Sequence, residues 1–111
     1  MYQNKGAGNE TVVADLSSSL VNSKNQSYLI QFTVFNAGGA ETVPSGGSCV
    51  VEAGINPGST AVVEVENSPI DMTDADYWLT YIPDSCLSRM EFTMTSLDSG
   101  YTWDVYVKPV A

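Results

Sequence analysis

The sequence contains no histidine, and this absence excludes a large group of enzymes. Histidine is the usual general base near neutral pH and the usual nitrogen ligand in metal sites. Without it, Ser-His and Cys-His nucleophiles cannot be built, and two cysteines alone cannot complete a usual zinc site. A phosphate-binding loop and a dinucleotide-binding glycine pattern are also missing. The sequence therefore predicts a protein that is not an enzyme and has no catalytic residues.

Basic residues are scarce, because four Lys and Arg stand against thirteen Asp and Glu, for a net charge of -9. A field of this sign repels the phosphate backbone of nucleic acids and the surface of anionic membranes. Basic proteins and cations are the partners that it attracts. We therefore expect no nucleic-acid partner, and the same acidic surface would keep the chain soluble.

Long apolar segments are absent as well. No run reaches the roughly 18 apolar residues of a membrane span, so we expect no membrane insertion. The first ten residues are polar and lack the apolar stretch of a signal peptide. Charged residues make up only 15% of the chain, and uncharged polar residues of this kind are common on extracellular and virion proteins. We expect a virion or extracellular surface location, reached without a visible signal peptide.

What the chain does contain is a set of strand-forming runs. The longest is 28–36, in which Tyr28, Ile30, Phe32 and Val34 fall on one face and form a wholly apolar stripe. This pattern predicts a central strand with one face in the core. The Asn and Gly residues that follow favour a turn, because both accept a positive φ.

Shorter alternating runs follow at spacings typical of an antiparallel sandwich. They lie at 10–20, 49–53, 60–66, 77–82, 89–96 and 101–107. With 111 residues, the chain has the length of one domain. The sequence predicts an all-β, antiparallel β-sandwich of Ig-like or jelly-roll type over residues 10–111, with about seven strands and little or no helix. A small barrel is the alternative.

The alternation also predicts which side chains point inward. In the run 60–66, Ala61, Val63 and Val65 are expected to face the core, and Glu64 and Glu66 the solvent. In the last strand, Trp103 is expected to face the core together with the valines that follow it, and Asp104 is expected to face the solvent with Tyr106.

The segment 1–9 is expected to be an N-terminal arm, because it holds Gly, Asn and Gln residues without periodic apolar positions. One interpretation is a frayed terminus. The other is an extension that docks on a neighbouring subunit, with Tyr2 as its anchor.

Two cysteines, Cys49 and Cys86, are available for a disulfide. Such a bond would constrain the unfolded chain by about 3–4 kcal/mol on the loop-entropy model. The alternative is a pair of reduced thiols, buried as small apolar residues. The sequence does not decide between the two states.

Asp71, Asp74 and Asp76 form the most concentrated group of acids. Carboxylates close together in an irregular loop are the ligands that calcium prefers, so calcium is the one cofactor that the sequence suggests. The spacing does not match an EF-hand loop. The alternative is a solvated loop whose acids surround one turn of helix capped by Thr73.

Tyrosines are the candidate contact residues. Exposed Tyr and Trp side chains can anchor a protein contact or stack on sugar rings. We expect Tyr2, Tyr77, Tyr81 and Tyr106 to contribute to an interface. For Trp78, the pattern allows either a core position or a place in the interface.

These observations favour a non-enzymatic assembly subunit, such as a virion decoration, minor capsid or tail-associated protein that docks on other protein subunits as a homo- or hetero-oligomer. A carbohydrate-binding or adhesion module that uses exposed Tyr and Trp is the first alternative. A calcium-stabilised extracellular Ig-like domain is the second.

Overall fold

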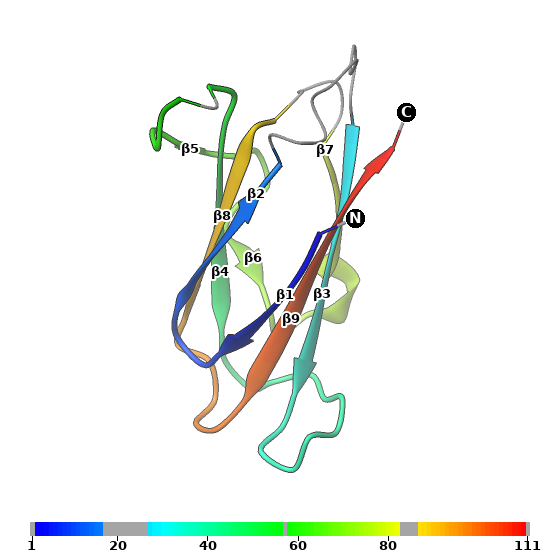
Figure 1. Cartoon of the computed structure of the whole chain (residues 1–111). Coiled ribbons are helices and arrows are strands. Elements are labelled where there is room, and N and C mark those ends of the chain that lie inside the picture. Colours follow the sequence, from blue (N-terminus) through cyan, green and yellow to red (C-terminus); the bar gives the residue numbers. More distant parts are fainter. Residues whose placement is uncertain (1, 17–26, 57, 83–86, 111) are drawn as a thin grey trace.

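The computed structural model describes residues 2–16, 27–56, 58–82 and 87–110. These residues form two antiparallel sheets and one short 3-10 helix, η2 (Ala75–Tyr77) (Figure 1). The order of strands in sheet A is β1 (Tyr2–Ala7), β9 (Thr102–Val110), β3 (Ser27–Phe35) and β7 (Leu79–Ile82). The order in sheet B is β2 (Thr11–Asp15), β8 (Arg89–Thr95), β4 (Ser48–Gly54) and β5 (Val63–Glu64), and β6 (Ile70–Asp71) also pairs with β4.

The predicted all-β, antiparallel and sandwich-like architecture is therefore confirmed. The described residues form nine strands rather than about seven. The difference arises because the N-terminal segment is itself a strand, and because residues 60–71 give two strands of two residues each. No helix in the described ranges has the length and apolar character of a membrane span.

The strand pairs are nested like those of one long hairpin. β1 pairs with β9, β2 with β8, β3 with β7, and β4 with β5 and β6, all antiparallel. These pairs alternate between the two sheets: the first and third lie in sheet A, and the second and fourth lie in sheet B. The β1–β2 connection thus crosses between the sheets at one side, while β7 and β6 lie at the other side.

The core lies between the two sheets and is centred on Phe32. The ring of Phe32 contacts Phe92 of sheet B edge-to-face, with 5.8 Å between the ring centroids, and it lies 6.3 Å from the ring of Trp103. The inward residues of β3 and β9 alternate with outward ones, as predicted for both strands. Tyr28 is fully buried at one end of β3, and its hydroxyl donates a hydrogen bond to the carbonyl of Leu87 at 3.1 Å.

Within the segment 1–9, which is expected to be an N-terminal arm, residues 2–7 form an edge strand of sheet A. Residues 2–7 pair with β9 over their whole length, from Tyr2 opposite Val107 to Ala7 opposite Thr102. The indole Nε1 of Trp103 donates a hydrogen bond to the carbonyl of Gly8 at 2.9 Å, which fixes the end of this strand. Local sequence did not indicate a strand, because the pairing depends on a partner about a hundred residues away.

The prediction for 60–66 is wrong in its details. Only Val63 and Glu64 pair with β4, and Val63 is 74% exposed rather than buried. Ala61 is exposed as well. Val65 packs against the core, as predicted, and its N–H donates to the carbonyl of Val51 at 2.9 Å. Pairing at the margin of a sheet provides a hydrogen-bond partner without a covering layer, so Val63 stays in solvent.

Asp104 lies on the predicted face of its strand but is not exposed to solvent as expected. It lies on the outer face of sheet A, as predicted, but only 6% of it is exposed. β9 is an interior strand, so its outer face is flanked by β1 and β3, with Lys5 and Thr33 opposite Asp104 in the register. Tyr106, on the same face, is partly buried for the same reason.

Candidate functional site

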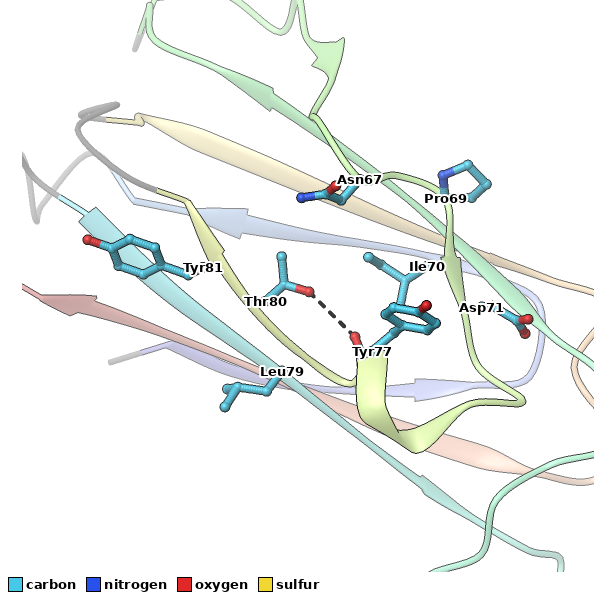
Figure 2. Close-up of a pocket in the computed structure, with 8 residues that line it drawn as sticks. All are labelled: Asn67, Pro69, Ile70, Asp71, Tyr77, Leu79, Thr80 and Tyr81. Atoms are coloured by element: carbon cyan, nitrogen blue, oxygen red, sulfur yellow. Dashed lines mark hydrogen bonds between the residues drawn. The ribbon is translucent and has the colours of Figure 1, made fainter.

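A cleft of about 530 Å³ opens along one side of the molecule, between the margins of the two sheets (Figure 2). One wall is formed by β7, an edge strand of sheet A, together with the end of η2. The other wall is the segment 67–71, which includes β6 at the margin of sheet B. The residues that line the cleft are Asn67, Pro69, Ile70, Asp71, Tyr77, Leu79, Thr80 and Tyr81.

Three large side chains on the β7 wall are exposed. Tyr77, Leu79 and Tyr81 have exposed fractions of 57%, 58% and 54%. In the register, Leu79 and Tyr81 lie opposite Gln31 and Leu29, on the outer face of sheet A. Because large apolar and aromatic side chains are normally buried, three of them together form an exposed apolar patch at this edge.

Tyr77 is held at the surface by the burial of its neighbour, Trp78. The Trp78 indole is 9% exposed, and its Nε1 donates a hydrogen bond to the carbonyl of Met72 at 3.0 Å. The backbone N–H of Trp78 donates to the carbonyl of Ala75 at 3.2 Å and closes the single turn of η2. Trp78 is therefore an anchor in the core, and it leaves Tyr77 outside.

The single helical turn of the alternative interpretation is present as η2, but its cap is Asp74 and not the expected Thr73. Asp74 Oδ1 accepts from the N–H of Asp76 at 3.0 Å, and the Asp74 carbonyl accepts from the N–H of Tyr77 at 3.1 Å. Thr73 instead donates both its N–H and its hydroxyl to Asp71 Oδ1, at 3.0 and 2.7 Å. An aspartate at this position performs the same capping role as threonine, so the local sequence pattern did not distinguish them.

The second wall is tied to the core through β4. The hydroxyl of Ser68 accepts from the N–H of Val51 at 2.9 Å, and the N–H of Met72 donates to the carbonyl of Gly47 at 3.0 Å. Between these two attachments, Ile70 is buried opposite Cys49. Both walls of the cleft are thus positioned by buried residues, which favours a preformed site.

The cleft carries negative charge. Two hydrogen bonds from Thr73 lower the pKa of Asp71 below its usual value, and the one from the hydroxyl has the larger effect. This exposed carboxylate is therefore ionised at neutral pH. Asp74 and Asp76 follow directly in η2 and its cap. Within the described ranges, no three acidic or cysteine side chains converge as the ligands of one metal ion, so the structure does not bring the predicted calcium ligands together.

Cys49 is a buried free thiol in β4. Burial raises its pKa to about 12, and a backbone hydrogen bond involving Thr93 opposes this shift only in part. The thiol is therefore protonated and unreactive in the folded protein. Cys86, the other cysteine of the possible disulfide, lies outside the described residues.

Of the four tyrosines predicted to form an interface, the structure brings two together. Tyr77 and Tyr81 line the same cleft. Tyr106 is partly buried in β9, with β3 between it and β7, and Tyr2 begins β1 at the opposite edge of sheet A. Trp103 lies in the core, as predicted, and Trp78, for which the sequence allowed either a core or an interface position, lies in the core as well.

The sequence-based list missed the residues of the second wall, above all Pro69 and Ile70. Nothing in their local pattern marks them, since they reach the cleft only through the pairing of β6 with β4. Leu79 had a detectable signal, because it alternates in register with Tyr77 and Tyr81.

A scan against protein-family models finds no matching family, and a search of curated proteins finds no match.

Proposed function

We propose that this protein is a non-enzymatic assembly subunit that docks on a protein partner through β7 and the adjoining cleft. The observation that carries this proposal is the exposure of Tyr77, at the end of η2, and of Leu79 and Tyr81, on the edge strand β7, beside a preformed cleft. Tyrosine-rich, apolar patches with a rigid backbone are the usual centres of protein interfaces. A virion or extracellular particle is the proposed location, as a decoration, minor capsid or tail-associated subunit.

We further propose that the sandwich is of jelly-roll rather than Ig-like type. Four nested antiparallel pairs that alternate between two sheets are what a long hairpin produces when it is rolled up, if β5 and β6 are taken as one interrupted strand. Viral capsid proteins and lectins use this type of fold. The fold alone is only an analogy for function, but it agrees with the assembly proposal.

The experiment is a size measurement of the tagged chain purified from its native source. We expect wild-type protein to elute in an assembly far larger than its own 11.9 kDa. The double variant Tyr77→Ser, Tyr81→Ser should elute as the free chain. A control variant, Val13→Ser with Val43→Ser, removes two exposed apolar residues elsewhere and should stay in the assembly. Wild-type protein that elutes as a monomer would contradict the proposal.

Carbohydrate binding is the second candidate, and one observation favours it. Tyr77 and Tyr81 line the same cleft, so two aromatic rings are available to stack on a sugar. Because both tryptophans are buried, tryptophan fluorescence is not a suitable reporter. Binding of polysaccharides that is lost in the Tyr77→Ser, Tyr81→Ser variant, with the native assembly intact, would favour this candidate over protein docking.

A further inference from the structure

The outer edge of β7 carries backbone hydrogen-bonding groups that no other described strand uses. The N–H of Phe32 donates to the carbonyl of Trp78 at 2.8 Å, and the same register pairs Ile30 with Thr80 and Tyr28 with Ile82. In an antiparallel pair, the residues between such partners point their N–H and C=O away from the neighbouring strand. Leu79 and Tyr81 therefore direct two donors and two acceptors outward, and no described strand pairs with them.

This edge lacks the usual protection against strand pairing. Natural sheets shield their edges with lysine, proline or bulges. β7 reads Leu-Thr-Tyr-Ile and has none of these, whereas the opposite edge of sheet A, β1, contains Lys5. An extended segment laid along β7 would meet all four outward backbone groups, and every second side chain of it would point into the cleft against Pro69 and Ile70.

Charge decides which kind of segment fits. The region 62–82 contains Glu64, Glu66, Asp71, Asp74 and Asp76, and no Lys or Arg. If a second copy of this chain, with its net charge of -9, docked here, the acids of the two copies would face one another and repel. A segment with lysine or arginine beside its apolar residues would be attracted instead.

We infer that the open edge of β7 binds an extended, basic segment of a different protein, which pairs with β7 as a fifth strand of sheet A and places alternate apolar side chains in the cleft. This inference rests on the proposed docking function and specifies its partner. Backbone pairing supplies affinity, the cleft selects apolar residues at alternate positions, and the acids select the sign of the charge.

The test uses fluorescently labelled peptides and the full chain, with binding measured by anisotropy at low and high salt. The probe is a peptide of alternating valine and threonine with two lysines at each end. We expect it to bind, and to bind more weakly at high salt because the attraction is screened. The same peptide with glutamates at the ends should not bind. A lysine-flanked peptide that is N-methylated at alternate amides should bind about tenfold more weakly, because it cannot complete the ladder.

A matched pair of protein variants tests the edge itself. Tyr81→Pro removes an outward N–H that β3 does not use, whereas Tyr81→Val keeps this donor while removing the same ring. We expect the proline variant to lose peptide binding and the valine variant to retain most of it. Circular dichroism and thermal melting show whether both variants are folded. If the proline variant does not fold, the N-methylated peptide tests the same hydrogen bonds on the wild-type protein.

The outcomes separate this inference from the docking function. Equal binding of the lysine and glutamate peptides, or no binding of either, overturns strand addition by a basic segment. The docking function then still stands if the Tyr77→Ser, Tyr81→Ser variant leaves its native assembly. Dimerisation of the wild-type chain that Tyr81→Pro abolishes would overturn the inference by making a second copy the occupant.

Discussion

Asp98 joins two loops at one end of the sandwich through a single carboxylate. Its Oδ2 accepts from the N–H and the hydroxyl of Ser45 at 3.0 and 2.9 Å, and its Oδ1 accepts from the N–H of Gly46 at 2.9 Å. The Ser45 N–H contributes most to a pKa of Asp98 that is lower than the usual value, and the Gly46 N–H adds to it. The same end carries the start of β4, so this clamp helps to position the strand on which the second wall of the cleft depends.

Replacing Asp98 by asparagine should lower the melting temperature at pH 7 by a few degrees, because the amide turns an NH₂ group toward donors. A carboxylate whose pKa is depressed by folding adds stability above its unfolded pKa, near pH 4, and this contribution is lost as the pH falls. The gap between wild type and Asp98→Asn should therefore close below about pH 4. Melting curves from pH 3 to 7 measure it.

The control for Asp98 is Glu41→Gln, which removes the same charge from an exposed side chain. It should leave the melting temperature nearly unchanged at every pH. A difference between Asp98→Asn and wild type that stays constant down to pH 3 would show that the ionised carboxylate is not the stabilising group. Asp71 also has a lowered pKa and acts in the same direction, so the double variant should flatten the acid limb further.

At the level of elements, β1 depends on a close approach between a glycine and a buried ring. Gly6 pairs with Trp103, and a Cβ added to Gly6 would overlap the Trp103 indole. Gly6→Ala should therefore reduce the free energy of unfolding by about 1–3 kcal/mol, because the ring is fully buried and has no room to move. Urea unfolding followed by tryptophan fluorescence measures the loss.

The matched control for β1 is Ala7→Ser, at the neighbouring, exposed position of the same strand. Its free energy of unfolding should stay within about 0.5 kcal/mol of wild type. If Gly6→Ala is equally harmless, β1 does not lie against Trp103 as described, and the N-terminal segment behaves as the arm that its sequence suggests.

The strands that could be predicted are those whose burial shows in their own sequence. β3, β8 and β9 alternate clearly, and the structure places them within a few residues of the expected ranges. β1 and β6 could not be predicted, since β1 is defined by its partner β9 and β6 by its pairing with β4. Side-chain alternation shows which face a residue takes, but it does not show whether a neighbouring layer covers that face.

The candidate site could likewise be predicted only in part from the sequence. Tyr77 and Tyr81 could be selected from the sequence because tyrosine is frequent at interfaces, and their spacing put them on one face. The cleft itself could not be predicted, because it exists only where β7 and β6 meet across the two sheets. Trp78 shows most clearly what the sequence could not decide. Its position in an aromatic run was compatible with the surface and with the core. The hydrogen bond from its indole to the carbonyl of Met72 is the tertiary contact that holds it in the core.

On the scale of the whole molecule, the excess of acidic residues affects stability through the summed charge. A net charge of -9 destabilises the compact state by self-repulsion, and any cation reduces this repulsion by screening. Calcium can therefore stabilise the protein without a dedicated site. A specific site would need about six to eight oxygen ligands around one ion. The described part of the chain contains no such convergence of acids, and Asp71 and Asp74 already accept hydrogen bonds from their own loop.

We therefore expect calcium and magnesium, at equal concentration and constant ionic strength, to raise the melting temperature by the same small amount. Magnesium is the control, because a calcium site selects against the smaller ion, whereas screening depends on charge alone. A chelator should reverse both shifts, and Asp76→Asn should leave both unchanged apart from the effect of one less charge. A shift that calcium alone produces, and that Asp71→Asn and Asp76→Asn each remove, would instead mean that these carboxylates close around the ion when it binds.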